Sequence, residues 1–316
     1  MKTVFLNIER INYDQKMDLS IFAEDVTYYA DSKEDEILER VKGNTIVVSK
    51  ELPLQGTLIE QFPDEVRMIC EAGTGYNNID LDACRRKGIM VCNTPAYSTH
   101  RVAHTAIMLM MNLSSSMQKQ LRMLYQGDHC NFTHHMSVDH VELNGKTLGI
   151  IGAGNIGMQV KRIALAMDMR ILIYTRTPKE AEEGVCYVSK EELLKESDFV
   201  SLHCPLSEAT YHMIDAEALA LMKNSAYLIN TSRGALIDEE ALIKALRNHD
   251  IAGAGLDVQE QEPMREDHPF YAMEEVIVTP HMGWRGLETR QRLLQLVAGN
   301  ITAFEEGQPI HVVVPA

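Results

Sequence analysis

A short apolar run that leads directly into a glycine-rich turn is the feature that most restricts how this chain folds. The run Thr147–Ile151 has the composition of a buried strand, and the six residues after it, Gly152–Gly157, read GAGNIG. A helical pattern with one apolar face follows and continues to Met167. In this context the first glycine permits a tight turn, the second lets the backbone approach a pyrophosphate, and the third lets the helix pack on the strand. The segment therefore predicts a dinucleotide site at the amino end of the helix.

Short apolar strands alternate with helical patterns along most of the chain. The glycine motif belongs to a series of six expected strands, at residues 147–151, 170–174, 198–203, 226–230, 251–257 and 276–279. An earlier series has expected strands at residues 1–7, 45–48, 66–70 and 89–92, with helical patterns that include 33–42 and 80–87. Strands joined by single helices form parallel sheets through right-handed crossovers. We therefore expect two α/β domains, the second with a doubly wound nucleotide-binding sheet.

The segments outside the two series indicate where the domains begin and end. One long Met-rich helix is expected over residues 98–126, between the two series. After the last strand of the second series, a helix at 288–305 and a strand at 312–314 are expected, and this tail is expected to return to the first domain. The first domain is therefore expected to comprise residues 1–97 and 286–316, and the dinucleotide-binding domain residues 98–285.

The composition excludes several classes of partner. The 316 residues contain 30 Lys and Arg against 45 Asp and Glu, which gives a formal net charge of −15. This excess of acid argues against nucleic acids and anionic membranes as partners, because both are bound by clustered basic residues. The longest apolar stretch, Ala106–Met111, is far shorter than the ~20 residues that cross a bilayer. Six cysteines lie scattered without a C-x-x-C pair, which is typical of reduced thiols in the cytoplasm. We therefore expect a cytoplasmic protein with neither a nucleic-acid nor a membrane partner.

The histidines give no indication of a metal site. Those at positions 129, 134, 135 and 140 lie in a polar stretch without the tight spacing of metal ligands. A solvated loop is expected there, and no metal is expected in this protein.

The end of the second strand of the later series bears on which dinucleotide binds. About 20 residues after the glycine motif, such folds commonly carry an Asp or Glu that accepts the ribose 2′-hydroxyl. Here the strand continues into Thr175 and Arg176 without an acid, and Thr177 and Lys179 are further candidates. Hydroxyl and basic groups suit a 2′-phosphate, which a carboxylate repels, so NADP(H) is favoured over NAD(H). A solvated loop with unrelated basic residues is the alternative.

Charged side chains follow the last three expected strands. Arg233 comes after the strand at 226–230, Glu262 after the strand at 251–257, and His281 after the strand at 276–279. Ligands of an open α/β sheet bind beyond the carboxyl ends of its strands, so these three side chains are expected to converge. Each has a structural explanation when taken singly, as a surface ion pair, a loop residue or a satisfied histidine. Together with the glycine motif they predict a catalytic site.

The chain resembles the D-isomer-specific 2-hydroxyacid dehydrogenases over nearly its whole length. The matching segments, in the order of the family, are Ala72–Asp80, Pro95–Thr99, the glycine motif, Leu202–Leu206, Ile229–Gly234, Gly255–Val258 and Pro280–His281. Residues 74–81 and 281–284 are most similar to the glycerate dehydrogenase, or hydroxypyruvate reductase, branch, and Asn12–Asp14 agrees with that. The resemblance implies a Rossmann dinucleotide domain, a flavodoxin-like α/β substrate domain, and a homodimer formed through the dinucleotide domain.

The resemblance also implies hydride transfer between NAD(P)(H) and a small 2-keto or D-2-hydroxy acid, with hydroxypyruvate and glyoxylate foremost. Arg233 would hold the carboxylate and carbonyl of the keto acid, and the backbone amides near Thr74 and Gly75 would hold the far side of the carboxylate. His281 would give a proton to the carbonyl oxygen, with Glu262 orienting its ring. The implied cofactor contacts are Gly152, Gly154, Asn155, Ile156, Gly157, Thr175, Arg176, Cys204, Pro205, Thr210, Thr231, Arg233, Asp257, His281 and Gly283. Among them Asp257 would bind the nicotinamide carboxamide, and capping of a turn is its structural alternative.

Two positions depart from the pattern of the family, and one other function stays open. Arg101 stands where the family more often has a small residue, and His104 where it has Glu or Gln. Arg101 has two possible roles. It could place a positive charge near the nicotinamide or substrate, or it could lie on the surface or at a subunit interface. The alternative function is a dinucleotide-sensing, corepressor-like binding protein on the same scaffold, because such relatives keep the Arg, Glu and His residues.

Overall fold

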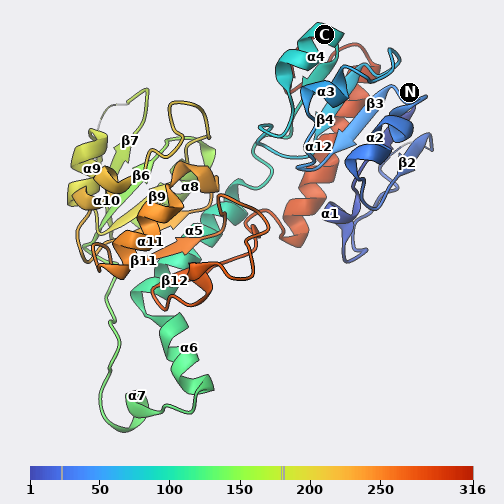
Figure 1. Ribbon diagram of the computed structural model, residues 1–316. Coiled ribbons are helices and arrows are strands. Elements are labelled where there is room, and N and C mark those ends of the chain that lie inside the picture. The colour runs from blue at the N-terminus through green and yellow to red at the C-terminus, as the bar shows by residue number, and fades with distance from the viewer. Residues whose placement is uncertain (23, 179, 181, 316) are drawn as a thin grey trace. The chain divides into compact units, whose positions relative to one another are not determined.

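The computed structural model describes residues 1–22, 24–178, 180 and 182–315, which form two compact units (Figure 1). The first unit comprises Met1–Ser98 and Trp284–Ala316, and the second comprises Thr99–Gly283. The chain thus passes from one unit to the other at 98/99 and 283/284, where the sequence predicted 97/98 and 285/286. None of the described helices has the length and apolar composition that a membrane crossing requires.

The first unit contains a six-stranded sheet in the order β13-β5-β4-β3-β1-β2. Its strands are β1 (Thr3–Phe5), β2 (Val26–Tyr28), β3 (Ile46–Ser49), β4 (Met68–Glu71), β5 (Met90–Cys92) and β13 (Val312–Val314). All neighbours pair in parallel except β13, which pairs antiparallel with β5. The order 2-1-3-4-5 of the parallel strands is that of flavodoxin-like sheets, as predicted.

Helices cover both faces of this first sheet, which explains why its strands are apolar on both sides. The helices are α1 (Glu9–Asn12), α2 (Glu34–Val41), α3 (Gly56–Ile59), α4 (Leu81–Lys87) and α12 (Leu287–Glu305). Buried residues of α2, α3 and α4 form one apolar core with the sheet, and those of α1 and α12 form another. The tail of the chain therefore belongs to the first unit, because α12 supplies one of its two cores.

The second unit contains a fully parallel seven-stranded sheet in the order β12-β11-β10-β9-β6-β7-β8. Its strands are β6 (Thr147–Ile151), β7 (Arg170–Tyr174), β8 (Val185–Tyr187), β9 (Phe199–Leu202), β10 (Tyr227–Asn230), β11 (Gly253–Leu256) and β12 (Val276–Val278). The order reverses between β6 and β9, so the loops that follow these two strands diverge and leave space at the carboxyl edge. The doubly wound fold predicted for this region is confirmed.

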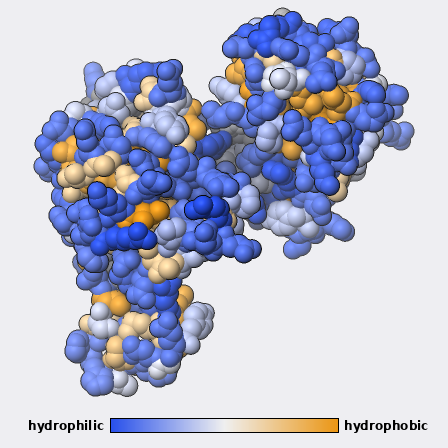
Figure 2. All heavy atoms as spheres, viewed as in Figure 1, coloured by the Kyte–Doolittle hydropathy of each residue, from blue (hydrophilic) through white to orange (hydrophobic). Residues whose placement is uncertain are grey.

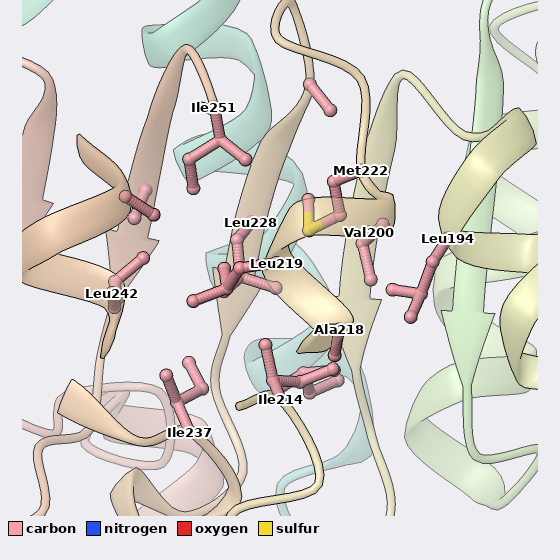
Figure 3. Packing of buried hydrophobic residues seen from close by; sticks show 14 of the residues in the cluster. Leu194, Val200, Ile214, Ala218, Leu219, Met222, Leu228, Ile237, Leu242 and Ile251 are labelled. Atoms are coloured by element: carbon pink, nitrogen blue, oxygen red, sulfur yellow. The ribbon is translucent and has the colours of Figure 1, made fainter. Parts of the chain in front are cut away.

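The second unit also contains helices, most of which enclose its sheet on both faces. They are α5 (Thr99–Ser114), α6 (Met117–Tyr125), α7 (Cys130–Thr133), α8 (Asn155–Leu165), α9 (Lys190–Glu196), α10 (Ala216–Leu221) and α11 (Glu239–Arg247), with short 3₁₀ turns η1 (Gly234–Leu236) and η2 (Pro269–Tyr271). One core joins the sheet to α9, α10 and α11 (Figure 3), and the opposite core joins it to α5 and α8. Two apolar faces hold the strand ends, and hence the loops that follow them, in place.

The prediction of one helix over 98–126 was wrong, because the chain breaks it into α5 and α6. Ser116 adopts a left-handed backbone conformation with φ 48°. The Ser114 and Ser115 hydroxyls both donate to the Met111 carbonyl, at 3.0 and 2.8 Å, and the Ser116 hydroxyl donates to the Asp139 carbonyl at 2.6 Å. Serine hydroxyls that bond to backbone carbonyls compete with the hydrogen bonds of the helix backbone, and the three consecutive serines end the helix here.

Two short edge strands, β2 and β8, were not predicted. Each has three residues and lies at an edge of its sheet, so neither shows the continuous apolar run of a central strand. The expected loop around the histidines at 129, 134, 135 and 140 contains one helical turn, α7, and all four histidines are exposed.

Candidate active site

The three glycines after β6 have three different structural roles. Gly152 has φ 106°, and a Cβ there would lie 2.6 Å from the backbone nitrogen of Cys204. A Cβ on Gly157 would lie 2.1 Å from the Gly152 carbonyl oxygen, so the start of α8 packs directly on the turn. Gly154 has extended backbone, and a Cβ there would have no heavy atom within 4 Å. The turn needs the first and third glycines for itself, whereas the second borders open space at the amino end of α8.

The loops after β9 and β10 border the same edge of the sheet. The Thr210 hydroxyl donates to the Pro205 carbonyl at 2.8 Å and accepts from the Ser207 amide at 2.8 Å, which closes the loop after β9 into a compact turn. After β10, the hydroxyl of Thr231 is buried and has no hydrogen-bond partner among the described residues. An unpaired buried hydroxyl costs about 1–3 kcal/mol, so Thr231 is a candidate to bond a ligand at this edge.

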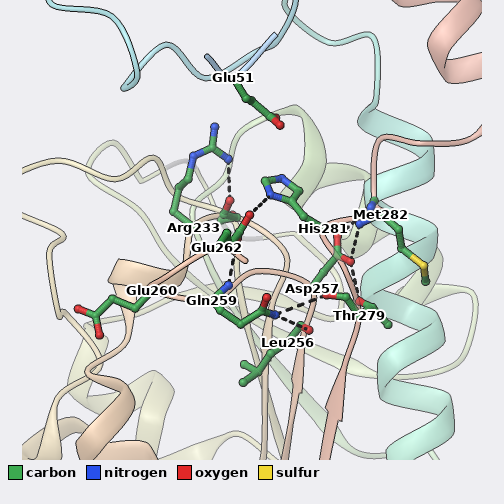
Figure 4. Close-up of polar contacts among 12 residues, drawn as sticks. Glu51, Arg233, Leu256, Asp257, Gln259, Glu260, Glu262, Thr279, His281 and Met282 are labelled. Carbon is green, nitrogen blue, oxygen red and sulfur yellow. Dashed lines mark hydrogen bonds and ion pairs between the residues drawn. The ribbon is translucent and has the colours of Figure 1, made fainter. Parts of the chain in front are cut away.

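A carboxylate and an imidazole form a direct pair after β11 and β12. The Nδ1 atom of His281 lies 2.8 Å from Oε2 of Glu262, and Oε1 of Glu262 accepts from the Gln259 amide at 3.1 Å (Figure 4). The His281 side chain is 21 % exposed, and its Nε2 atom has no partner in the described part of the chain. Its backbone has φ 48°, an uncommon conformation for a residue other than glycine. The pair thus leaves one imidazole nitrogen open to a ligand.

The turn that carries His281 is held by a buried carboxylate. Asp257 accepts from the Thr279 hydroxyl at 2.6 Å, from the Met282 amide at 2.9 Å and from the Gly283 amide at 2.8 Å. These three bonds explain how a turn outside any regular element keeps His281 in one position. Turn capping, the structural alternative for Asp257, is therefore what this arrangement displays, while a contact to the cofactor stays a prediction.

Arg233 reaches the same group of side chains because two loops touch along their backbones. A Cβ on Gly234 would lie 1.9 Å from the carbonyl carbon of Gln259, so only glycine permits this approach of the loops after β10 and β11. The Arg233 guanidinium donates to the Ser232 carbonyl at 2.7 Å, and the Arg233 carbonyl accepts from Asn230 Nδ2 at 2.8 Å. Figure 4 shows Arg233, Glu262 and His281 beyond the ends of β10, β11 and β12. The convergence of these loops was predicted, but the contributions of Gly234 and of the Gln259 amide were not.

The turn Gly73–Gly75 follows β4 in the first unit. Two of its carbonyl groups are occupied: Gly73 accepts from the Thr94 amide at 3.0 Å, and Thr74 accepts from Asn93 Nδ2 at 2.8 Å. The amide groups of Thr74 and Gly75 donate to no acceptor within the described residues. Free amides in such a turn attract an anion, which is the arrangement that the sequence predicted for a carboxylate.

Comparison with known proteins decides the family. Residues 107–283 match the model of the D-isomer specific 2-hydroxyacid dehydrogenase NAD binding domain. A glyoxylate reductase from Korarchaeum cryptofilum is 43% identical over 276 residues, which cover 86% of this chain and 83% of that protein. A hydroxypyruvate reductase from Blautia hydrogenotrophica is 34% identical over 287 residues, 88% of each chain. The chain belongs to the D-isomer-specific 2-hydroxyacid dehydrogenase family.

The solved structures agree with this assignment. An acyclic imino acid reductase in complex with NADPH and D-Arg superposes with a TM-score of 0.86 at 28% identity, covering 99% of this chain and all of the other. As a member of the 2-hydroxyacid dehydrogenase family, the chain of the present structure is therefore an oxidoreductase that uses a nicotinamide dinucleotide. The open space over Gly154 and the unpaired hydroxyl of Thr231 fit such a cofactor, because a dinucleotide offers a pyrophosphate to the first and polar atoms to the second.

The residues that bear on the choice of dinucleotide follow β7 in this dehydrogenase. Thr175 is half-buried, and the exposed Arg176 has no ion-pair partner among the described residues. No carboxylate lies at the end of the strand, and Lys179 falls outside the described residues. In α5, Arg101 donates to the Thr105 hydroxyl at 2.9 Å, while His104 is exposed. Arg101 therefore has a partner within its own helix.

Proposed function

We propose that this dehydrogenase reduces glyoxylate and hydroxypyruvate to glycolate and D-glycerate, and that Arg233, Glu262 and His281 are its catalytic residues. The observation that carries the proposal is the 2.8 Å contact between His281 and Glu262, which leaves Nε2 of His281 open. The substrates are suggested by the relatives named glyoxylate reductase and hydroxypyruvate reductase.

Proton transfer is the task of the His281–Glu262 pair. A keto group that becomes a hydroxyl needs one proton on its oxygen, and Nε2 of His281 donates it as the general acid. Glu262 accepts a hydrogen bond from Nδ1, which fixes the tautomer and stabilises the positive charge of the imidazolium. In the oxidative direction neutral His281 takes the proton back. When bound, the nicotinamide supplies or accepts the hydride.

Recognition of the acid falls to Arg233 and to the turn Gly73–Gly75. The guanidinium of Arg233 is planar and always charged, so it suits the adjacent carboxylate and carbonyl oxygens of a 2-keto acid. The free amides of Thr74 and Gly75 bind the carboxylate. Both devices act locally, which a protein with a net charge of −15 requires in order to hold an anion.

The dinucleotide is held by the glycine turn and by the loops that border it. The amides at the start of α8 bind the pyrophosphate. Cys204, Pro205, Thr210 and Thr231 line the remainder of the cofactor site, and Thr175 and Arg176 give NADP(H) the advantage over NAD(H). The site also includes Asn155, Ile156, Asp257 and Gly283.

A homodimer formed through the second unit is part of the proposal. Helix α6 has no buried residue, and Figure 1 shows α6 and α7 extending away from the sheet of their own unit. Tyr125 is 84% exposed and Phe132 is 78% exposed, and Figure 2 shows apolar residues over this segment. A second copy of the chain would bury these side chains, since a monomer rarely exposes such a patch. Light scattering of the wild type and of Tyr125→Ser with Phe132→Ser tests this, and a monomeric wild type refutes it.

The free state of all six cysteines supports a reducing compartment, the cytoplasm, as the place of action.

The main test is a panel of 2-keto acids assayed with both reduced dinucleotides. We expect glyoxylate and hydroxypyruvate to consume NADPH, with chiral analysis of the hydroxypyruvate product identifying D-glycerate. Pyruvate and a branched 2-keto acid serve as size controls. The absence of turnover with all of these acids would refute the proposed activity.

A further inference from the structure

A buried lysine lies in the first unit, outside the residues to which the proposed function assigns a role. Lys50 follows β3 and is 1% exposed. Its ammonium pairs with the carboxylate of Glu51 and lies 4.1 Å from the centre of the Trp284 ring. Burial by itself lowers the pKa of Lys50, but Tyr97, Glu51 and Glu71 together outweigh it, and the net shift is upward. Lys50 is therefore a cation in the interior of the unit.

A buried carboxyl group lies next to this cation. Glu71, the last residue of β4, is fully buried, and its Oε1 accepts from the Glu51 amide at 2.9 Å. Its Oε2 accepts from the Ser49 hydroxyl at 3.1 Å and from Asn78 Nδ2 at 2.9 Å. Glu71 precedes the turn Gly73–Gly75 in the chain and bonds to Asn78 after it. It thus connects both sides of the turn to the segment that follows β3.

The side chains of Lys50 and Glu71 both lie against that turn. A Cβ on Gly73 would lie 3.0 Å from Oε1 of Glu71 and 3.4 Å from Nζ of Lys50. The absence of a side chain at Gly73 therefore lets the ammonium approach the backbone whose amides at Thr74 and Gly75 are free. Two carboxylates, those of Glu51 and Glu71, lie in the same cluster, and Lys50 is the cation that offsets them.

We propose that Lys50 is a positioning residue for the substrate carboxylate and makes the turn Gly73–Gly75 selective for anionic substrates over uncharged carbonyl compounds. It does so in two ways: its charge acts on the nearby Glu71, whose hydrogen bonds fix the segment around the turn, and it supplies the positive charge that the turn would otherwise lack. This inference rests on the proposed function, because it concerns the carboxylate that the turn is proposed to bind.

The test compares an acid with its uncharged ester in variants of Lys50. Kinetic constants for glyoxylate and methyl glyoxylate are measured for the wild type, Lys50→Met, Lys50→Arg and the control Lys42→Met, which removes a lysine that pairs with Glu39 on the surface of the same unit. For Lys50→Met we expect the KM of glyoxylate to rise ~10-fold, the size of one charge interaction of about 1.4 kcal/mol, with kcat changing far less. The ratio of kcat/KM for the acid to that for the ester falls by the same factor. Lys50→Arg restores part of it, and Lys42→Met changes nothing.

A purely structural role gives a different result. If Lys50→Met lowers kcat/KM equally for acid and ester, so that their ratio is unchanged, the inference is wrong.

The wild type offers a second measurement that does not depend on a variant folding. Glu71 is faced by cationic Lys50, by Glu51 and by the Cys70 thiol, and burial raises the pKa of Glu71 to about 7 and that of Cys70 to about 12. The acid-to-ester ratio should therefore fall between pH 6 and pH 8 as Glu71 ionises, and a constant ratio contradicts the inference.

The inference and the proposed function fail in distinguishable ways. If the wild type reduces no 2-keto acid, the proposed function is refuted. Calorimetric titration of the NADPH-loaded protein with oxalate, a small carboxylate that needs no turnover, then still tests the turn. Weaker oxalate binding by Lys50→Arg and Lys50→Met than by Lys42→Met supports the role of Lys50, and equal or absent binding throughout refutes it.

Discussion

The two units of this dehydrogenase each end a parallel strand in a glycine turn, but the means proposed for stabilising an anion there differ. In the second unit the turn Gly152–Gly157 runs into α8, an 11-residue helix, so the free amides are backed by a helix dipole. In the first unit the turn Gly73–Gly75 does not open a helix, and the side chains of Lys50 and Glu71 lie against it instead. In the proposed function, a chain of net charge −15 thus binds its two anions through two different local arrangements.

The difference has a consequence for chemistry. The amides at a helix start do not titrate, whereas a lysine and carboxyl pair changes charge with pH. The second unit also carries the only proton donor in the proposed mechanism. The second unit is therefore expected to control kcat, cofactor affinity and, through Arg233, part of the KM for the acid, and the first unit to control the dependence of that KM on pH.

Replacing the proposed proton donor should have the largest effect, because it should lower kcat and leave ligand affinity nearly unchanged. His281→Ala removes the general acid and should lower kcat by ~10²–10⁴-fold, the usual contribution of such a group. The affinity for NADPH and the KM for glyoxylate should change far less, because the amides of both turns remain. Steady-state kinetics and fluorescence titration of NADPH measure these quantities. An unchanged kcat would show that another group donates the proton.

The buried ionisable groups of the two units should affect stability in opposite directions. Burial raises the pKa of Glu71 to about 7 from its ordinary 4.5, so the folded state alone holds this proton between those values, and stability falls by about 3 kcal/mol as the pH rises from 4.5 to 7. Burial lowers the pKa of His203 to about 4 from 6.5, so the unfolded state alone holds that proton, and stability rises by about 3 kcal/mol as the pH rises from 4 to 6.5.

These two effects nearly cancel in the wild type between pH 4.5 and 6.5. Glu71→Gln leaves only the contribution of His203, so the free energy of unfolding of this variant should rise with pH over that range while that of the wild type stays nearly constant. Denaturant titrations at several pH values measure both. Parallel curves for the two proteins would mean that Glu71 is ionised in the folded state throughout.

Substitution by alanine should distinguish the structural role of Gly152 from the proposed cofactor-binding role of Gly154. Gly154→Ala places a methyl group in open space on an ordinary backbone, so thermal stability should be unchanged. The same methyl group should crowd the pyrophosphate and weaken NADPH binding by about 1–3 kcal/mol. Gly152→Ala, at φ 106°, should in contrast destabilise the fold by about 1–3 kcal/mol. Equal melting temperatures for the two variants would contradict this distinction.

The smallest effect is expected at the end of β7. Arg176 is exposed, so its contact with a 2′-phosphate should contribute only about 1 kcal/mol. Arg176→Ala should therefore reduce the preference for NADPH over NADH about fivefold. Arg170→Ala, an exposed arginine at the start of the same strand, is the matched control. A wild type that prefers NADH tenfold would remove the basis of this prediction.

Local sequence patterns predicted the elements that depend on local physics. The glycines at 152 and 157 lie where the backbone conformation or close packing demands them, Gly154 borders open space, and Arg233, Glu262 and His281 each follow a recognisable strand. Features that depend on competition between local and distant bonds were not predicted. The break at Ser116 relies on a bond to Asp139, and the edge strand β8 is too short to carry a pattern of its own.

The sequence by itself thus determined the α/β class, the dinucleotide motif and the family, because each depends on residue types at fixed spacing. Only the tertiary structure decided what Asp257 and Lys50 do. In the sequence Asp257 is one acid among many, and folding makes it the acceptor for the turn around His281. Lys50 has the composition of a surface residue, and it becomes a buried cation because the tail of the chain places Trp284 over it and β4 places Glu71 beside it. Burial and charge state are properties of packing, and packing joins residues that the sequence keeps far apart.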